Sequence, residues 1–404
     1  MSKPIVAISR AAAGADAVFA AVQSAVEQAC EFAELVRPGA TVLLKPNVFA
    51  PQPPPATTSP QVVAAVARLC RQAGAARVIV AEGRSISTAK YRPDHNTTLA
   101  CFEATGMAQA VAQAGAEALA LEQDEFCEVA LPEGELLRRA LVPITLLEAD
   151  VVINLPALKI HSLTLATLAI KNFHGVVSDP DKLFSHCYRE ARLARKLVDI
   201  VTLRKPDLNI VSGLTGLEGD HAMPPGRPVE MGIIIAGQDI VAVDAVAGAA
   251  MGLAPEEVDT TRIAHQRGLG EGQLENIEIR GASLEQVRKP FARPDTQIND
   301  EKFPGLRLFA GDYCRACEYY ICRGLEAMQA QGRLSEQHPL NLVIGRNPPA
   351  PARLEGKTIL VGDCCLASAS VKPLRDNLLL EGRLAYLWAC PPMEFRLRAA
   401  ELLG

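Results

Sequence analysis

The sequence predicts an α/β protein, with a large parallel or mixed sheet covered by helices on both faces and a smaller C-terminal α/β domain. Short apolar runs alternate with helical segments through most of the chain, which is typical of βαβ units. Aromatic residues make up 4% of the sequence and hydrophobic residues 49%, a balance that favours helices packed on a parallel sheet. Six of the eleven cysteines lie after residue 313, which indicates a separate domain there.

The first part of the chain shows the strand–helix–strand alternation most clearly. A helix at residues 15–36 is stopped by Arg37-Pro38-Gly39, because proline and glycine both interrupt helices. The next helix opens at Ser59-Pro60, where a serine cap precedes a proline in the first turn. The elements predicted up to residue 81 are strands at 4–9, 41–44 and 77–81 and helices at 15–36 and 59–73.

The same alternation continues and defines a predicted core domain at residues 1–281. Its later elements are predicted as strands at 150–155, 208–212 and 229–236 and helices at 163–171, 183–203, 239–251 and 256–266. Residues 282–310 lose this rhythm and carry several Pro, Asp and Arg, so we predict a linker there. The cysteine-rich domain is predicted at 311–404, with helices at 313–331 and 393–403 and strands at 342–344, 358–361 and 384–389.

The overall charge and the apolar stretches exclude several classes of protein. The formal net charge is −5, without the basic surface expected of a nucleic-acid binder. The most apolar stretch, residues 232–251, is interrupted by Asp239 and Asp244, so no transmembrane helix is predicted. The N-terminus also lacks the features of a signal peptide. We therefore expect a cytoplasmic protein with no nucleic-acid or membrane partner, whose cysteines stay reduced.

Four cysteines are predicted to converge on one metal centre. Cys314 and Cys317 form a CxxC pair at the start of a predicted helix, where they share one face and the helix dipole favours thiolates. Cys364 and Cys390 each follow a predicted strand. Loops at the carboxyl ends of parallel strands meet at one edge of a sheet. Because four thiolates are the usual ligands of a [4Fe–4S] cluster, we predict such a cluster here.

The other cysteines and another metal are the alternatives to this ligand set. A structural zinc ion also takes four thiolates, but usually from two CxxC-like pairs, and this sequence has one. Cys365 is adjacent to Cys364 and is an alternative ligand. Cys322 is too far along and around its helix from Cys314 to share the site. The cysteines interpreted as small buried hydrophobic residues are Cys30, Cys70, Cys101, Cys127 and Cys187.

A second group of polar residues lies at predicted strand ends in the core domain. The predicted catalytic residues are Lys159, His161 and Lys171, and the predicted substrate-binding residues are Lys45, Asn47, Asn172, His186 and Glu218. Strand-end geometry would gather them into one crevice, whereas the alternative for each is an ordinary surface charge. Lysines in a crevice would bind a carboxylate or phosphate. A histidine there could act as acid or base near neutral pH.

Known nucleotide-binding and acyl-transfer motifs are missing from the sequence. No GxGxxG opens a helix after a strand, and neither GxxxxGK[ST] nor GxSxG occurs. An added flavin would favour a redox enzyme, but no sequence signal calls for one.

Several longer motifs resemble the domain of unknown function 362 family, a family of uncharacterised iron–sulfur-centre proteins. The matching segments are residues 43–47, 58–60, 158–164, 170–175, 218–219 and 243–245, together with the Cys314–Cys317 pair, 362–364 and 390–392. In members with a C-terminal iron–sulfur region, the matching tail cysteines are the cluster ligands, which implies the same role here. The sequence departs from the family pattern at Ser212 and Ala389.

Two functions of different classes follow from these residues. The first is an enzyme in which a [4Fe–4S] centre transfers electrons to, or acts as a Lewis acid on, a small anionic substrate held by Lys45, Lys159, His161 and Lys171. The second is an electron-transfer or metallocluster-handling protein whose polar crevice binds a redox partner protein or a cofactor. A structural zinc protein is the third and weakest interpretation.

Overall fold

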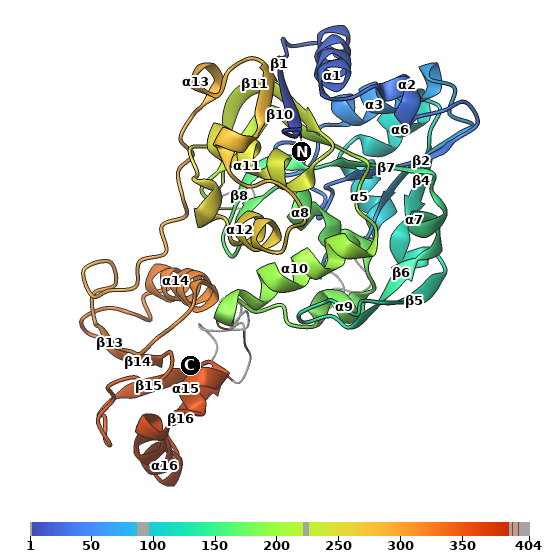
Figure 1. Cartoon of the computed structure of the whole chain (residues 1–404). Helices are drawn as coiled ribbons and strands as arrows, with labels where there is room; N and C mark the ends of the chain where they lie inside the picture. The colour runs from blue at the N-terminus through green and yellow to red at the C-terminus, as the bar shows by residue number, and fades with distance from the viewer. Residues whose placement is uncertain (1, 87–96, 221–225, 388–389, 391–394, 396–404) are drawn as a thin grey trace. The chain divides into compact units, whose positions relative to one another are not determined.

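The computed structural model describes residues 2–86, 97–220, 226–387, 390 and 395 (Figure 1). The chain divides into two units, which we describe separately. The core unit comprises Met1–Ser185 and Leu193–Pro294, and the cysteine-rich unit comprises His186–Arg192 and Asp295–Gly404. The second unit therefore begins before the predicted boundary at residue 311, and it includes a short segment from the middle of the chain.

The core unit is built on a ten-stranded mixed sheet. Its main strands, in spatial order, are β12 (Glu278–Gly281), β1 (Ile5–Arg10), β11 (Arg227–Gly237), β10 (Leu208–Glu218), β7 (Val151–Leu155), β2 (Thr41–Pro46), β3 (Arg77–Glu82) and β4 (Glu117–Ala120). The strands from β10 to β4 are parallel, whereas β11 runs antiparallel to both of its neighbours. The predicted α/β class is therefore confirmed.

Helices cover both faces of this sheet (Figure 1). One face packs against α1 (Ala15–Ala29), α3 (Pro60–Gln72) and α6 (Met107–Gln113), with Val42 and Leu44 of β2 in that core. Leu43, between them, is equally buried but lies outside that core, because side chains of a strand alternate between the two faces. The remaining helices of the core unit are α2 (Phe32–Leu35), α5 (Thr98–Ala104), α7 (Ile144–Glu148), α8 (Ala169–Asn172), α9 (Asp179–Leu183), α10 (Arg192–Leu203), α11 (Ile240–Ala250), α12 (Asp259–Gln266) and α13 (Leu284–Val287).

The segment at 157–172 differs from the predicted helix at 163–171. It forms a β-hairpin of β8 (Ala157–His161) and β9 (Leu165–Thr167), followed by α8, a single helical turn. Leu165 has a left-handed backbone, with φ of 68°, which a continuous helix cannot accommodate. Because β8 also pairs with β10, sheet hydrogen bonds outweigh the helical preference of this apolar sequence.

The long helix predicted at 183–203 is interrupted as well. Helix α9 ends at Leu183 and α10 begins at Arg192. Between them, Ser185, Glu190 and Ala191 have positive φ values of 51–53°. The interruption separates the segment His186–Arg192, which belongs to the cysteine-rich unit, from the helices around it.

The cysteine-rich unit has a four-stranded parallel sheet of its own. Its strands, in spatial order, are β13 (Leu306–Ala310), β14 (Leu340–Ile344), β15 (Lys357–Val361) and β16 (Leu384–Leu387). Strand β13 lies within the range predicted as a linker. Helix α14 (Arg315–Ala330) packs on one face, and α16 (Lys372–Leu380) packs on the other, next to α15 (Asp363–Leu366). The predicted final helix at 393–403 lies outside the described residues.

A small antiparallel sheet completes the core unit, formed by β5 (Phe126–Ala130) and β6 (Arg139–Pro143). No helix in the described part of the chain is long and apolar enough to span a membrane.

Candidate functional site

The first pair of sulfur atoms lies at the N-terminus of α14. Cys314 is the N-cap residue, with an extended backbone, and Cys317 lies in the first turn. Their side chains are hydrogen-bonded to each other. This bond and the backbone N–H groups of Ala316 and Cys317 outweigh burial and lower the pKa of Cys314 to about 6. The same bond and burial raise the pKa of Cys317. Cys314 is therefore the more readily ionised thiol of the pair.

Cys364 joins this pair from the end of β15. Gly362 makes the turn between β15 and α15 with φ of 91°, a left-handed value that favours glycine. A Cβ atom added to Gly362 would lie 3.8 Å from the Sγ atoms of both Cys317 and Cys364. The missing side chain therefore leaves space beside the two sulfurs.

Cys390 is the fourth predicted ligand, and its thiol is coupled to those of Cys187 and Cys314. The Cys187 side chain is hydrogen-bonded to Cys390, and this bond and burial raise the pKa of Cys390. The negative charges of Cys187 and Cys314 raise it further, which places all three thiols near one another. The fold thus brings together the four predicted cysteines and Cys187, which was predicted to be a small buried hydrophobic residue.

The two cysteines next to this group in the sequence lie in different surroundings. The Cys365 side chain is fully buried and its Sγ donates to the carbonyl oxygen of Val343 at 3.4 Å, in the core on the other face of the small sheet. The Cys322 Sγ lies 3.4 Å from the Lys302 ammonium. Burial raises the pKa of Cys365 to about 12 and that of Cys322 to about 11. Both therefore behave as buried thiols.

A thiol group of this kind fits an iron–sulfur cluster by its donor chemistry. Thiolates that bind a cluster are each bonded to a different iron, so they stand farther apart than thiolates around one ion. Among the described residues, no group of three or more His, Cys, Asp or Glu side chains is close enough to hold a single metal ion. A cluster does not require that close spacing.

The second candidate site lies in the core unit, where the parallel strands end. Lys45 at the end of β2 forms an ion pair with Glu82 at the end of β3, at 2.5 Å, and both side chains are buried. The Lys45 ammonium also donates to the carbonyl oxygen of Pro46 at 2.8 Å. Glu82 accepts the backbone N–H groups of Val48 and Gly83 at 3.0 and 2.9 Å. The Lys45 ammonium and the Glu82 carboxylate therefore already have partners within the protein.

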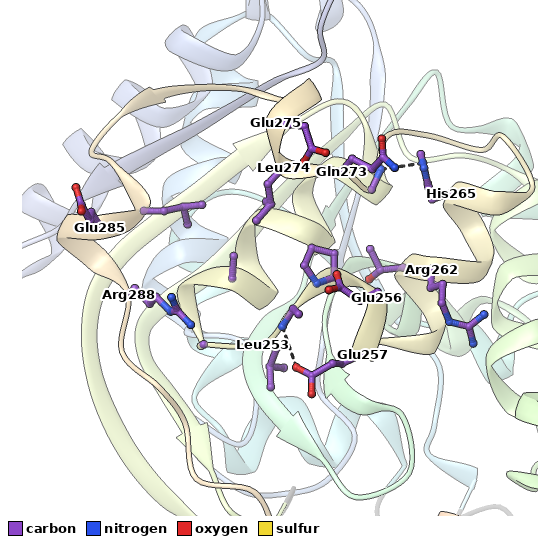
Figure 2. Close-up of a pocket in the computed structure, with 17 residues that line it drawn as sticks. Leu253, Glu256, Glu257, Arg262, His265, Gln273, Leu274, Glu275, Glu285 and Arg288 are labelled. Carbon is purple, nitrogen blue, oxygen red and sulfur yellow. Dashed lines mark hydrogen bonds between the residues drawn. The ribbon is translucent and has the colours of Figure 1, made fainter.

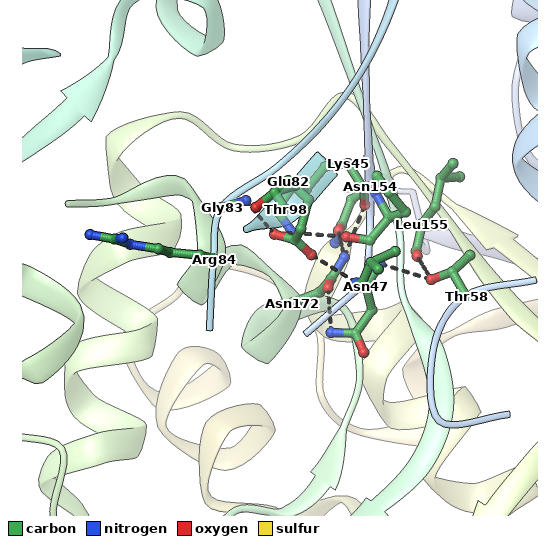
Figure 3. A network of polar contacts seen from close by, with 12 residues as sticks. Lys45, Asn47, Thr58, Glu82, Gly83, Arg84, Thr98, Asn154, Leu155 and Asn172 are labelled. Atoms are coloured by element: carbon green, nitrogen blue, oxygen red, sulfur yellow. Dashed lines mark hydrogen bonds and ion pairs between the residues drawn. The ribbon is translucent and has the colours of Figure 1, made fainter. Parts of the chain in front are cut away.

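Asparagine side chains connect this ion pair to neighbouring strands (Figure 3). Asn172 donates to the Lys45 carbonyl oxygen at 3.0 Å and to the Asn154 side chain at 2.8 Å. Its own side-chain oxygen accepts from Asn47 at 3.0 Å. Asn47 in turn accepts from the Lys159 ammonium at 2.7 Å. Four of the predicted residues, Lys45, Asn47, Lys159 and Asn172, therefore belong to one buried network.

Lys159 is held by the protein itself. Its ammonium donates to the Ala56 carbonyl oxygen at 2.5 Å and lies 4.2 Å from the centre of the Phe49 ring. Burial, together with the positive charge of Lys171, moves the pKa of Lys159 well below its ordinary value. Lys159 is thus a buried lysine whose hydrogen bonds go to backbone and side-chain oxygens of the core unit.

Lys171 differs from the other lysines of this group. Among the described residues its ammonium has no hydrogen-bond partner, whereas Lys45, Lys159 and Lys182 each donate to at least one oxygen. Burial lowers the pKa of Lys171 to about 8, Glu82 opposes this shift, and the charge of Lys45 adds to it. Lys171 is therefore the lysine of this group that can meet a ligand.

Helix α8, which carries Lys171 and Asn172, is held by a buried carboxyl group. Asp244 of α11 accepts the backbone N–H groups of Ala169 and Ile170 at 2.6 and 3.3 Å. Burial raises the pKa of Asp244 to about 7, although these two hydrogen bonds oppose the shift. Asp244 therefore fixes the start of the turn that presents Lys171.

His161 has a defined tautomer at the end of β8. Its Nδ1 atom accepts the backbone N–H groups of Leu163 and Thr164 at 3.1 and 3.3 Å. An Nδ1 atom that accepts hydrogen bonds carries no proton, so the ring proton is on Nε2. His161 can therefore donate a hydrogen bond through Nε2, but it cannot accept a proton at Nδ1 without losing these two hydrogen bonds.

Two predicted substrate-binding residues are not part of the lysine network. Glu218 at the end of β10 pairs with Arg227 at 2.9 Å and accepts the backbone N–H of Ala292 at 2.8 Å. His186 belongs to the cysteine-rich unit. Glu82, the last residue of β3, was not among the predicted site residues, although its strand-end position is the same signal that selected them.

A cavity of about 940 Å³ lies elsewhere in the core unit, around α12 (Figure 2). Leu253, Arg262, His265 and Glu275 line it, and it contains none of the predicted site residues. Its wall is fixed in part by the Ala254 N–H, which donates to Glu257 at 3.0 Å.

The fold and the thiol group define an α/β protein with a candidate sulfur-ligand site in its smaller unit. Residues 42–249 match the family described as Domain of unknown function (DUF362), and the chain belongs to this family. It is 30% identical over 262 residues to the Thylakoid-associated protein sll1697 of Synechocystis sp., covering 63% of this chain and 76% of that relative. The lactate racemase apoprotein of Thermoanaerobacterium thermosaccharolyticum is similar with a TM-score of 0.41 and 12% identity, over 100% of this chain and 81% of that structure.

Proposed function

We propose that this chain binds one [4Fe–4S] cluster in its cysteine-rich unit and is an enzyme that acts on a small anionic substrate. The observation that carries the proposal is the gathering of Cys314, Cys317, Cys364 and Cys390 around the start of α14. The sulfur donors match the ligand chemistry of such a cluster. When bound, the cluster would supply one-electron transfer or Lewis-acid chemistry.

The chain's own residues favour bound negative charge at the sulfur site. The hydrogen bond with Cys390 and, to a smaller extent, Arg192 lower the pKa of Cys187, whereas burial raises the pKa of Cys364 and Arg189 only partly opposes that shift. The N-terminus of a 16-residue helix, α14, adds its positive dipole end beside Cys314. The thiolates of Cys314 and Cys187 are thus favoured, whereas the pKa values of Cys317, Cys364 and Cys390 are raised, so these three thiols would lose their protons on binding iron.

In the core unit, Lys171 is the residue proposed to contact the anionic substrate. Lys45 and Lys159 are occupied by protein oxygens, so they hold the buried network together and do not contact the substrate. His161 would donate a hydrogen bond from Nε2, and Asp244 and Asn172 would hold the turn that carries Lys171. Of the three catalytic residues predicted from the sequence, Lys171 and His161 are therefore proposed to contact the substrate, and Lys159 is not.

The second proposed function is an electron-transfer or metallocluster-handling protein with a partner protein. It is favoured by one observation, that most lysines of the buried network already have protein partners. Either function fits a cytoplasmic protein, because a reducing compartment keeps the thiols available for iron.

The decisive experiment is metal analysis and spectroscopy of the full chain purified without oxygen. We expect roughly four iron per chain, a brown protein, and an EPR signal after reduction. Stoichiometric zinc without iron, in protein never exposed to air, would refute the cluster. A cluster whose EPR signal is unchanged by a panel of small carboxylates and phosphates would favour electron transfer over catalysis.

A further inference from the structure

Cys187 lies in the thiol group although it comes from a different part of the chain. Its side chain is hydrogen-bonded to Cys390, and the negative charge of Cys314 acts on it. Half of the sequence separates Cys187 from Cys390, so this contact depends entirely on the fold of the cysteine-rich unit. Five thiols are thus present where a [4Fe–4S] cluster uses four.

The segment that carries Cys187 is anchored beside the other ligands. Tyr188 packs against the guanidinium group of Arg315, 5.1 Å from the ring centre, and its hydroxyl accepts from that group at 3.4 Å. Tyr188 directly follows Cys187 and Arg315 directly follows Cys314. The contact between Tyr188 and Arg315 therefore connects the two segments that carry these cysteines. Glu190 adds a contact at 3.4 Å with Arg346, which follows β14.

The segment that carries Cys187 contains two residues with a strained, left-handed backbone. Glu190 and Ala191 have φ values of 53° and 52°, left-handed conformations that are unfavourable for residues other than glycine. Such strain persists only where the surrounding contacts require it. Here the strained turn lies between Cys187 and the start of α10, and it keeps Cys187 next to Cys390.

We propose that Cys187 and Cys390 share one ligand position of the cluster: either one binds the iron as thiolate while the other donates an S–H hydrogen bond to it. This inference rests on the proposed function. The sharing follows from the direct hydrogen bond between the two side chains, because two thiols that close face the same corner of the site. Hydrogen bonds to ligand sulfurs raise the reduction potential of a cluster, so the pair also sets its potential.

Iron content distinguishes a shared position from a single ligand. Cys187→Ser and Cys390→Ser should each retain about four iron per chain when purified without oxygen. The double variant should lose iron or convert to a three-iron cluster with its own EPR signal. The matched control is Cys187→Ser with Cys322→Ser, because Cys322 lies outside the thiol group. Loss of iron in either single variant, or full iron in the double variant, overturns the sharing.

The reduction potential gives a readout that does not need the double variant. Cys187→Ala removes the S–H donor and should lower the potential, whereas Cys187→Ser keeps an O–H donor and should restore part of the shift. An unchanged potential in Cys187→Ala overturns the inference. Wild-type protein without iron would instead refute the proposed function, and the shared position with it.

Discussion

The ammonium group of Lys45 lies 2.5 Å from the carboxylate of Glu82, and almost nothing of either side chain is exposed. Burial lowers the pKa of Lys45 and Glu82 raises it, so the charged form of Lys45 depends on its partner. The pair lies where β2 and β3 end, and Asn172, the neighbour of Lys171 in α8, donates to the Lys45 carbonyl oxygen. The ion pair therefore supplies the buried charges next to the candidate site in the core unit.

Glu82→Gln should destabilise the protein strongly. It leaves the buried Lys45 ammonium without a compensating charge, and removing one partner of a buried ion pair costs about 3–5 kcal/mol. Urea unfolding followed by circular dichroism measures the loss. The control is Glu117→Gln, which removes the partner of Arg77 in an exposed pair between β3 and β4 and should change the free energy of unfolding far less. Equal losses in the free energy of unfolding for the two substitutions would show that the buried ion pair stabilises the protein no more than the exposed one.

The sheet of the core unit was predictable, whereas the partners of its lysines were not. Apolar runs rich in Val and Ile are expected as buried strands, and β2, β3 and β7 lie where they were predicted. The oxygen that occupies Lys159 belongs to Ala56, in a proline-rich loop without periodic pattern. Such a contact forms only when the whole sheet is assembled, so one sequence does not reveal it.

The same reason explains the outcome for the cysteines. The CxxC spacing of Cys314 and Cys317 places both at the start of one helix, which local geometry predicts. Cys187 stands alone in its segment, and nothing nearby in the sequence distinguishes it from Cys70, which is fully buried in the core. Its hydrogen bond with Cys390 depends on the fold of the cysteine-rich unit, and no local sequence pattern indicates that contact.

Asp244→Asn should change how stability depends on pH. The folded-state pKa of Asp244 is raised to about 7 from its ordinary value near 3.8, so the folded protein holds a proton that the unfolded chain releases. Stability contributed by Asp244 is therefore lost as pH rises between these two values. The asparagine variant lacks this loss, so it should gain on the order of 2 kcal/mol relative to wild type between pH 5 and pH 8.

Unfolding free energies of both proteins at several pH values provide the measurement for Asp244. Asp239→Asn, at the N-cap of α11, serves as a control for removing a carboxylate from the same region without changing a contact of α8. A constant difference between wild type and Asp244→Asn over this pH range would contradict the raised pKa.

Serine substitutions in the thiol group should divide the cysteines into two classes. Cys314→Ser, Cys317→Ser and Cys364→Ser each remove a proposed ligand whose position is not the one shared by Cys187 and Cys390, so iron content should fall well below that of wild type. Cys365→Ser and Cys322→Ser should keep iron near the wild-type value, because their side chains lie in other surroundings. Iron analysis with visible spectra decides the matter. If Cys365→Ser loses iron and Cys364→Ser retains it, Cys365 is the ligand and Cys364 is not.

The last prediction concerns anion binding at Lys171. Its pKa is lowered to about 8, so its amine is charged below that pH and neutral above it. Sulfate keeps its charge over the same range, so its binding should weaken roughly tenfold or more between pH 6.5 and pH 9.5, because a hydrogen bond to a charged group contributes about 1.5–3 kcal/mol. Calorimetric titration measures this change.

Variants at position 171 test whether this lysine is responsible. Lys171→Arg should bind sulfate equally at both pH values, since arginine stays protonated. Lys171→Met should bind weakly at both, whereas Lys205→Met, at an exposed position, should behave as wild type. Equal sulfate affinity of wild type and Lys171→Met at pH 6.5 would remove Lys171 from the site.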